Sequence, residues 1–214
     1  MSLPVIILGG GGHALVLIDA LMQLKREIIG YTDTDSGKAP VLGVPLLGSD
    51  EKILEHDPAQ VMLVNGMGSI ESRALRRELH DLFRARGYRF ARVIHPSAVV
   101  SPHARLEDGV QILAGAVVQP ECRLGAGTIV NTGARVDHEC LVGAHVHIAP
   151  GSIVTGNVRI GDGAHIGAGA VLVKEVAIGA RSVVGAGAVV VEDVPEDVTV
   201  AGVPARVIRH RTVK

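Results

Sequence analysis

The sequence predicts two domains of different fold class, an α/β, Rossmann-like half domain followed by an all-β parallel β-helix. Three observations support this: a strand–glycine–helix pattern near the start, a six-residue period of aliphatic residues in the second half, and a change of composition between them. The four aromatic residues of the 214-residue chain are Tyr31, Phe83, Tyr88 and Phe90, and all precede Ile94. We therefore expect domains at residues 1–92 and 93–214.

The first domain opens with the stretch "LPVIILGGGGHALVLIDALMQL", which reads as a buried strand, a glycine turn and an amphipathic helix. A second apolar segment, "EIIGYTDTD", ends in acidic residues. A third, "AQVMLVNGMGS", again leads through a glycine turn into a helical stretch, "IESRALRRELHDLFRARG". This βαβαβ order predicts a parallel sheet with its ligand at the carboxyl ends of the strands.

The first glycine turn matches the pattern G-x-G-x-x-A. It follows a strand and opens a helix, where backbone N–H groups can bind a diphosphate; a tight turn without a ligand is the alternative. An acidic residue about 20 positions later fits a nucleoside hydroxyl or a base edge. The expected nucleotide site comprises Gly10, Gly11, Gly12, His13, Asp33, Asp35 and Gly66. The arginines of the second helix, expected to form a solvated face, are Arg73, Arg76, Arg77, Arg84 and Arg86.

The second domain is predicted by an aliphatic residue at every sixth position, seventeen times without interruption. A small or branched residue recurs four positions after each of them. Such a repeat is typical of a parallel β-helix, in which each short strand adds to one wall and each aliphatic side chain points inward. The series is Ile94, Val100, Leu106, Ile112, Val118, Leu124, Val130, Val136, Val142, Ile148, Val154, Ile160, Ile166, Leu172, Ile178, Val184 and Val190.

The hexads "LGAGTI", "IGDGAH", "IGAGAV" and "VGAGAV" resemble those of the left-handed β-helix of hexapeptide acyltransferases. The resemblance implies three hexads per triangular coil and a homotrimer with active sites between neighbouring prisms. Residues 18 positions apart then lie side by side on one wall, about 4.8 Å apart. Cys122 and Cys140 are such a pair at an inward position, so we expect buried free thiols. His147 and His165 are another pair and should stack.

The domain order narrows the resemblance. A "GGGGHA" half domain ahead of a hexapeptide prism that closes with "AGVPARVIR" is similar to the bacterial nucleotide-sugar acyltransferases. This group includes N-acetyltransferases of UDP-linked 4-amino sugars and of GDP-perosamine, together with sialic acid O-acetyltransferase-like proteins. The resemblance implies acetyl-CoA as co-substrate, a nucleotide-linked amino sugar as acceptor, and no metal.

The stretch "NTGARVDHECLVGAHVHIAPG" resembles the catalytic segment of this group, and the matching histidine, His138, would be the general base. Imidazole titrates close enough to neutrality to accept the proton that an attacking amine loses. Glu139 can hold the ring tautomer and stabilise the imidazolium. The resemblance places Asn131 and His147 near the sugar or the thioester, and assigns no role to His145.

The resemblance also places acetyl-CoA along the outside of the prism, toward its C-terminal coils. Its pantetheine would contact backbone around Ala168, Gly185 and Ala186, with His147 close by. Lys174 or Arg181 could reach its phosphates.

We therefore expect an acetyl-CoA-dependent N-acetyltransferase that acts on the 4-amino group of a nucleotide-linked deoxysugar, for bacterial surface polysaccharide. "YTDTDS" lacks the adjacent acidic pair associated with the UDP-sugar members, which favours another nucleotide and makes GDP-perosamine the first choice. Three alternatives stay open: a sugar O-acetyltransferase, a nucleotide-sugar-binding trimer without catalysis, and a zinc enzyme similar to γ-class carbonic anhydrases. The zinc enzyme would use His138, His145, His147 and His165.

Composition excludes other classes. Lys plus Arg (21) nearly balance Asp plus Glu (22), so no net field favours nucleic acid or an anionic membrane. No apolar run approaches the roughly 18 residues of a transmembrane helix. The N-terminus resembles a strand and turn more than a signal peptide, and two cysteines fit a reducing compartment, so we expect a cytoplasmic protein.

Overall fold

The computed structural model describes residues 3–68 and 73–210. The chain divides into two compact units, residues 1–96 and residues 97–214. The division falls between Pro96 and Ser97, close to the boundary expected from the loss of aromatic residues after Phe90.

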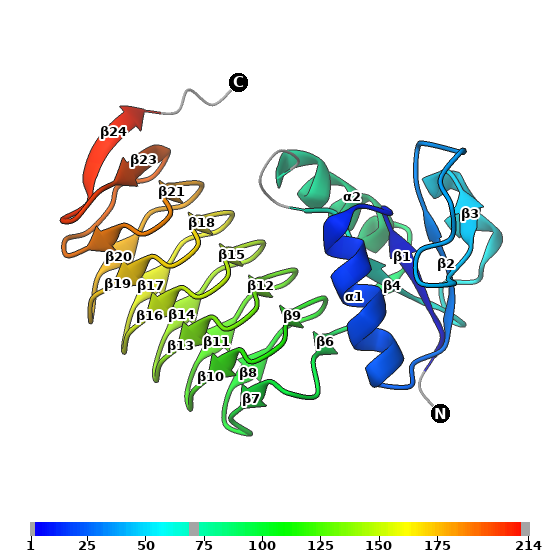
Figure 1. The fold of residues 1–214 in the computed structure, drawn as a ribbon, viewed down its shortest axis with the longest axis horizontal. Coiled ribbons are helices and arrows are strands. Elements are labelled where there is room, and N and C mark those ends of the chain that lie inside the picture. The colour runs from blue at the N-terminus through cyan, green and yellow to red at the C-terminus, as the bar shows by residue number, and fades with distance from the viewer. Residues whose placement is uncertain (1–2, 69–72, 211–214) are drawn as a thin grey trace. The chain divides into compact units, whose positions relative to one another are not determined.

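The first unit is built on a parallel sheet in the order β3-β2-β1-β4-β5 (Figure 1). Its strands are β1 (Val5–Leu8), β2 (Ile28–Thr32), β3 (Leu46–Gly48), β4 (Met62–Asn65) and β5 (Arg89–Phe90). Helix α1 (Gly12–Gln23) connects β1 to β2, and helix α2 (Arg73–Ala85) connects β4 to β5. The two strand–glycine–helix patterns of the sequence are therefore confirmed; residues 70–72, expected to begin the second helix, lie outside the described residues.

The connection between β2 and β4 differs from the expected βαβαβ order. It contains β3 and a 3-10 helix, η1 (Asp50–Glu55), in place of an α-helix. The segment "KAPVLGVPLLGSDEKILEHDP" places glycines and prolines every few residues. Because proline and glycine both disfavour a helix interior, only a single short helical stretch forms there.

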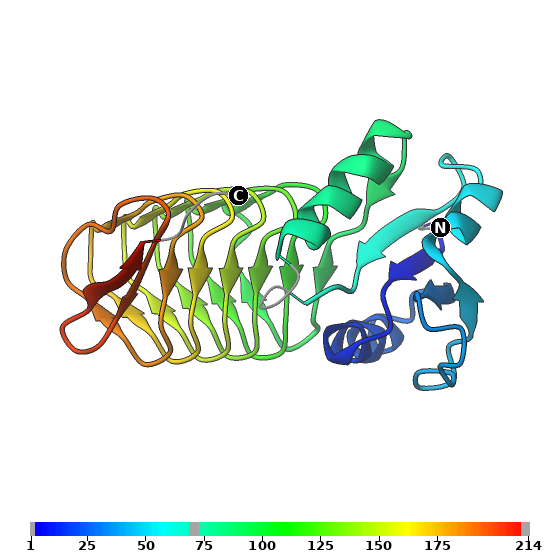
Figure 2. The ribbon, with the colours of Figure 1, turned by 90° about the horizontal axis from the view of Figure 1, so that it is seen from above.

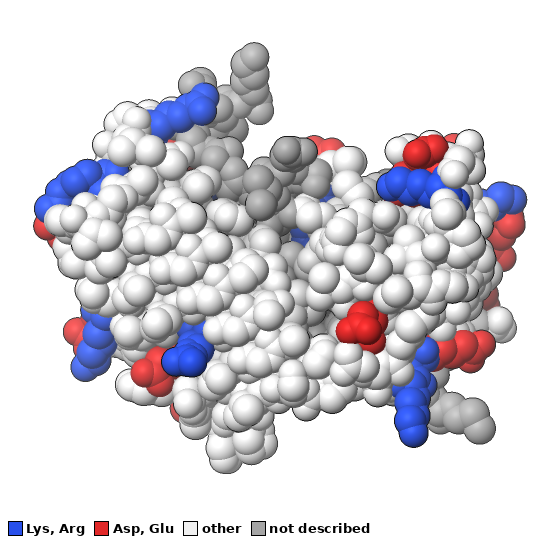
Figure 3. All heavy atoms as spheres, viewed as in Figure 1, with Lys and Arg blue, Asp and Glu red and all other residues white. Residues whose placement is uncertain are grey.

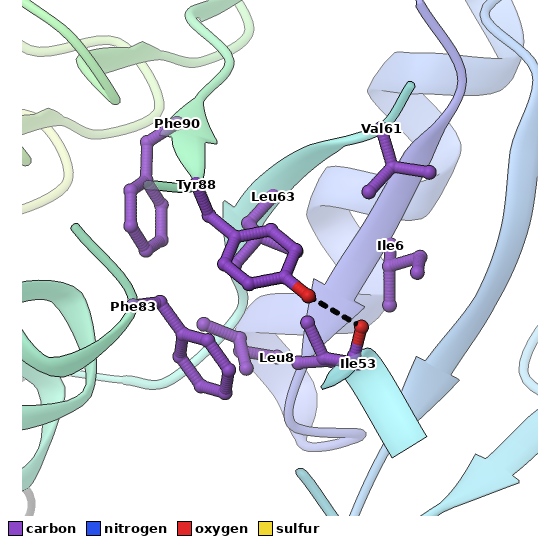
Figure 4. Close-up of a cluster of buried hydrophobic side chains, with 8 residues drawn as sticks. All are labelled: Ile6, Leu8, Ile53, Val61, Leu63, Phe83, Tyr88 and Phe90. Carbon is purple, nitrogen blue, oxygen red and sulfur yellow. Dashed lines mark hydrogen bonds between the residues drawn. The ribbon is translucent and has the colours of Figure 1, made fainter. Parts of the chain in front are cut away.

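The core of the first unit gathers most of the aromatic residues of the chain (Figure 4). The cluster consists of Ile6, Leu8, Ile53, Val61, Leu63, Phe83, Tyr88 and Phe90. The Tyr88 hydroxyl donates to the carbonyl oxygen of Ile53 and lies equally close, 2.8 Å, to that of His56, so the one polar atom of this ring is satisfied. A helix packed on a sheet leaves room for rings of this size, which a narrow β-helix does not.

The second unit is a three-walled parallel β-helix of two-residue strands (Figures 1 and 2). The first wall contains β7 (Val99–Val100), β10 (Val117–Val118), β13 (Arg135–Val136), β16 (Ile153–Val154), β19 (Val171–Leu172) and β22 (Val189–Val190). The second contains β8 (Arg105–Leu106), β11 (Arg123–Leu124), β14 (Leu141–Val142), β17 (Arg159–Ile160) and β20 (Ala177–Ile178). The third contains β9 (Gln111–Ile112), β12 (Ile129–Val130), β15 (His147–Ile148), β18 (His165–Ile166), β21 (Val183–Val184), β23 (Val198–Ala201) and β24 (Arg206–His210). The strand order of this sheet ends with β6 (Val93–Ile94), which precedes the division at Pro96.

From β7 to β22 the register of the prism follows the repeat: each strand residue pairs with the one 18 positions later, as Val118 does with Val136 and His147 with His165. In the last coil the spacing shortens to 16 residues, because Val183 of β21 pairs with Thr199 of β23. The second residue of each strand points inward; Val136 and Val154 are fully buried. The closing segment "AGVPARVIR" turns back, because β24 pairs antiparallel with β23. The expected coil of three hexads is therefore confirmed.

Two kinds of turn matter for function. The 1–2 edge is the column of turns from the first wall to the second, and residues 137–140 form one of them. The 3–1 edge is the column from the third wall to the first, and residues 131–134 form one of those. The first wall separates the two edges within each coil.

Among the described residues no helix has the length and apolar character needed to span a bilayer. Figure 3 shows one face of the molecule, where basic and acidic side chains are scattered and no broad basic area forms.

Candidate active site

A cavity of about 350 Å³ opens in the first unit at the carboxyl ends of β1 and β4. The sheet order reverses between these two neighbouring strands, which is where open α/β sheets bind ligands. The cavity is lined by Gly9, Gly10, Gly11, Asp33, Thr34, Lys38, Asp50, Gly66, Met67, Gly68, Leu75 and Leu79.

Four of the expected nucleotide-site residues line this cavity: Gly10, Gly11, Asp33 and Gly66. Gly12 and His13 form the first turn of α1, whose N-terminus begins beside the cavity lining at Gly11. Asp35 is exposed, is not part of the lining, and closes a small turn by accepting from the N–H of Gly37 at 2.9 Å. Of the two candidate carboxylates, Asp33 is therefore the one at the cavity.

Asp33 ties the glycine turn to the strand beside it. Its carboxylate accepts from the N–H of Gly10 at 2.9 Å and from the N–H of Asp35 at 3.0 Å, and it forms an ion pair with Lys38 at 2.7 Å. Burial opposes ionisation, but the hydrogen bonds from Lys38 and the two backbone N–H groups outweigh it and lower the pKa of Asp33.

Lys38 was missed by the sequence analysis. Its ammonium group pairs with Asp33, and the residue lines the cavity, so a positive charge lies beside the glycine turn. No periodicity marks this residue, because it lies in an irregular loop after β2; a basic residue shortly after the acidic one is the only signal available.

Two glycines of the cavity are required by close packing. A Cβ on Gly10 would lie 2.4 Å from Cε2 of Tyr31, whose ring is fully buried. A Cβ on Gly66 would lie 2.8 Å from the carbonyl oxygen of Leu8. Both distances are far below van der Waals contact, so any side chain there would displace the strands that shape the cavity.

Arg76 corrects the expectation of a solvated arginine face on α2. Its side chain is buried, and its guanidinium donates to the carbonyl oxygens of Asn65 at 2.9 Å and Met67 at 2.7 Å. In return, the side-chain amide of Asn65 donates to the carbonyl oxygen of Arg76. The end of β4 and the turn after it therefore hold this guanidinium in the interior, because buried backbone carbonyl groups are normally hydrogen-bonded. Arg77, the next residue, is exposed as expected and pairs with Asp81.

We predict that Asp33→Asn lowers the free energy of unfolding by about 1–3 kcal/mol at pH 7, because hydrogen bonds to a charged acceptor are lost. Because the pKa of Asp33 is lower in the folded protein than in the unfolded chain, the carboxylate stabilises the fold at pH values above the unfolded pKa of about 3.9. This stabilisation is lost as the pH falls through the lower pKa of the folded state. Urea unfolding of both proteins at neutral and acid pH measures this. Asp35→Asn is the control, with a smaller loss; a difference that grows on acidification would contradict the prediction.

The second group of candidate residues lies on the 1–2 edge of the prism. Nδ1 of His138 lies 2.9 Å from Oε2 of Glu139, and their side chains are 49% and 65% exposed. The turn is fixed by the neighbouring coils: the N–H of Glu139 donates to the carbonyl oxygen of Pro120, and the N–H of Asn157 donates to that of His138. A carboxylate thus orients an imidazole whose other nitrogen is available to a ligand.

The two cysteines lie directly behind this turn, fully buried and as free thiols, as expected. The Cys122 thiol donates to the carbonyl oxygen of Asp137 at 2.9 Å, and the Cys140 thiol to that of Thr155 at 3.2 Å. The neighbouring Cys122 thiol, together with burial, raises the pKa of the Cys140 thiol. A buried, protonated thiol is a poor nucleophile.

Asn131 and His147 form a separate group beside the 3–1 edge. The side-chain amide nitrogen of Asn131 lies 3.0 Å from Nε2 of His147, and its amide oxygen accepts from the N–H of Thr132. His147 is buried, and its ring meets that of His165 edge-on at 5.1 Å. The expected stacking pair is therefore in contact, but within one chain neither histidine lies on the edge that carries His138.

The residues expected at acetyl-CoA divide in the same way. Ala168, Gly185 and Ala186 lie in turns of the 3–1 edge, whereas Lys174 lies on the 1–2 edge and pairs with Glu175 at 3.1 Å. Arg181 is engaged by the carboxylates of Glu196 and Asp197. Its pKa is raised by the hydrogen bond to Asp197.

The zinc alternative needs three histidines at one point. Within the described part of the chain, no three of His138, His145, His147 and His165 come close enough to bind one ion.

Each of the two units matches a known protein family. Residues 4–80 match the PglD N-terminal domain, and residues 139–174 and 157–192 match the bacterial transferase hexapeptide (six repeats). No match is found among curated proteins.

Solved structures match over nearly the whole chain. A mutant of perosamine N-acetyltransferase from Caulobacter crescentus, in complex with CoA and GDP-perosamine, is 40% identical with a TM-score of 0.91, covering 96% of this chain and 97% of that one. The acetyltransferase domain of PglB from Neisseria gonorrhoeae, in complex with acetyl coenzyme A, is 37% identical with a TM-score of 0.91, covering 96% and 98%. WeeI from Acinetobacter baumannii is 25% identical with a TM-score of 0.81, covering 97% and 100%.

The predicted fold class, an α/β half domain followed by a left-handed parallel β-helix, is confirmed. The chain belongs to the hexapeptide-repeat acetyltransferases that carry a PglD-type N-terminal domain, and it is an acetyl-CoA-dependent acyltransferase.

Proposed function

We propose that this enzyme transfers the acetyl group of acetyl-CoA to the 4-amino group of a nucleotide-linked amino-deoxysugar, with GDP-perosamine as the first substrate to test. The observation that carries the proposal is the exposed His138–Glu139 pair, because it offers an oriented general base on one edge of the prism. A structure 40% identical to this chain holds CoA and GDP-perosamine, which supports the choice of substrates.

His138 acts as the general base and Glu139 as its orienting partner. When Glu139 accepts from Nδ1–H, the imidazole is held in the tautomer whose Nε2 carries the lone pair. The sugar amine attacks the thioester carbonyl, Nε2 takes the proton that the amine loses, and Glu139 stabilises the imidazolium. The negative charge on the carbonyl oxygen is met by a backbone N–H of the prism. Direct transfer is favoured, because Cys122 and Cys140 are both buried.

The nucleotide part binds in the cavity of the first unit. Its diphosphate lies against the backbone of Gly10, Gly11 and Gly12 at the N-terminus of α1, where peptide dipoles favour negative charge. His13 and Lys38 supply further contacts to the phosphates or the sugar. Asp33, Asp35 and Gly66 complete the nucleoside side of the site.

A homotrimer completes the acetyl-transfer site. The outward positions of the first wall are apolar except for Arg135: Val99, Val117, Ile153, Val171 and Val189. If this wall faces the threefold axis, the 1–2 edge of one copy meets the 3–1 edge of the next. His138 and Glu139 would then face Asn131 and His147 of a second copy, and acetyl-CoA would lie between Lys174 and the turns at Ala168, Gly185 and Ala186.

The location we infer is the cytoplasm, where acetyl-CoA is made. Two free cysteines fit a reducing compartment.

The nature of the acceptor atom gives a direct test. An amide resists alkaline hydroxylamine, whereas an acetyl ester of a sugar hydroxyl is cleaved by it. Product formed from GDP-perosamine and acetyl-CoA should therefore survive hydroxylamine treatment, and the 4-hydroxy counterpart of the sugar should give little product. A hydroxylamine-sensitive product, or preference for the hydroxyl sugar, would overturn N-acetylation in favour of O-acetylation.

A further inference from the structure

Gly156 lies one coil beyond His138, at the same position of the 1–2 edge. A Cβ built on Gly156 would lie 2.6 Å from Cε1 and 2.7 Å from Nε2 of the His138 ring, and 3.2 Å from its Nδ1. Three ring atoms thus occupy the space that a side chain would take. The imidazole lies directly over the Cα of the glycine, and the closest atoms include the nitrogen assigned to proton transfer.

The backbone does not require a glycine here. The φ angle of Gly156 lies outside the left-handed region; the residue that adopts that conformation in this turn is Asn157, with φ 58°, as Glu139 does one coil earlier with φ 59°. Other coils place side chains at the equivalent position without loss of register: Pro102, Pro120, His138, Lys174 and Glu192. The turn therefore accepts a side chain, and the space taken by the imidazole is the remaining reason for a glycine.

We propose that Gly156 is a positioning residue for the general base: its missing side chain lets the His138 ring lie against the next coil in contact with Glu139. The inference rests on the proposed function. It concerns the space above the Cα and requires no contact between Gly156 and substrate. An added methyl group would push the ring outward and separate Nδ1 of His138 from the Glu139 carboxylate, which now lies at 2.9 Å.

Gly156→Ala is therefore expected to lower kcat by about 10- to 100-fold, since a displacement of about 1 Å can cost that much, while KM for both substrates stays nearly constant. The decisive comparison is a double-mutant cycle with His138→Asn. If Gly156 acts through the ring, the alanine adds almost no further loss in the His138→Asn background. An equal fall in kcat in both backgrounds, or an unchanged kcat in the wild-type background, would overturn the proposal.

A second readout does not depend on activity. The ring Hε1–Cε1 signal of His138 in a ¹H–¹³C spectrum, assigned by its absence in His138→Asn, should shift in Gly156→Ala. Pro102→Ala, at the same turn position three coils before Gly156, is the matched control and should leave both the signal and kcat unchanged. A His138 signal identical in wild type and Gly156→Ala would overturn the positioning role. A shifted signal in a protein inactive on every amino sugar would uphold that role and overturn the proposed function instead.

Discussion

His138→Asn is expected to lower kcat by at least about 100-fold, the low end for loss of a general base. Asparagine keeps a polar side chain of similar reach but cannot accept a proton at neutral pH. Because the proton is transferred only during reaction, KM for acetyl-CoA and for the nucleotide sugar should change little. Steady-state thiol release at varied substrate concentrations measures both parameters.

His103→Asn is the matched control for this variant. His103 is an exposed histidine on the same edge of the prism, where its backbone N–H donates to the Ser101 hydroxyl. Its replacement should leave kcat within about twofold, as for most surface substitutions. The kcat of Glu139→Gln should lie between those of His138→Asn and His103→Asn. The His138 ring keeps a neighbouring hydrogen-bond acceptor but loses the negative charge that stabilises its protonated form. Undiminished activity in His138→Asn would place the base elsewhere and contradict the account of this edge.

Arg76→Met is expected to lower the free energy of unfolding by about 3 kcal/mol. The change leaves the buried carbonyl groups of Asn65 and Met67 without their guanidinium donor, at about 1–3 kcal/mol for each unsatisfied group. Burial lowers the pKa of Arg76 to about 9, which still leaves it charged at neutral pH, so these are charge-assisted bonds. Urea denaturation of the wild type and the variant, fitted with the same baselines, measures this loss of stability.

Arg77→Met on the same helix supplies the comparison. Arg77 is exposed and, among the described residues, forms one ion pair, with Asp81 at 3.5 Å, so its loss should cost less than about 0.5 kcal/mol. Because Gly66, Met67 and Gly68 line the nucleotide cavity, Arg76→Met should also raise KM for the nucleotide sugar more than KM for acetyl-CoA. Equal stability losses in the two variants would show that Arg76 does not hold this loop.

The prism was predictable almost residue by residue, because each coil repeats the same packing problem. A narrow interior accepts only small or branched side chains, so the aliphatic series and the buried pair Cys122 and Cys140 are visible in the sequence. The 18-residue register then follows, including the contact between His147 and His165.

The details of the nucleotide cavity were less predictable, because they depend on irregular segments. Lys38 reaches Asp33 from a loop without periodicity, and η1 replaces an expected helix where glycines and prolines interrupt the chain. The burial of Arg76 could not be read from α2 itself, since it is decided by the carbonyl groups of Asn65, at the end of β4, and Met67, which accept from its guanidinium.

The segment with Asn131 and His138 shows a third way in which the sequence left the candidate site undetermined. His138 and Asn131 lie in one short stretch of sequence, yet the first wall separates them, so seven residues of chain lead from one edge of the prism to the other. Within one chain the two side chains therefore lie at different edges of the prism. In the proposed trimer, a second copy would bring them into one site.

The most direct test of the account is thiol release from acetyl-CoA by the purified wild-type protein, measured with and without GDP-perosamine. We expect steady thiol release that requires the amino sugar and that matches the acetylated sugar formed mole for mole. No release above background with GDP-perosamine or with any UDP-linked 4-amino sugar would contradict it.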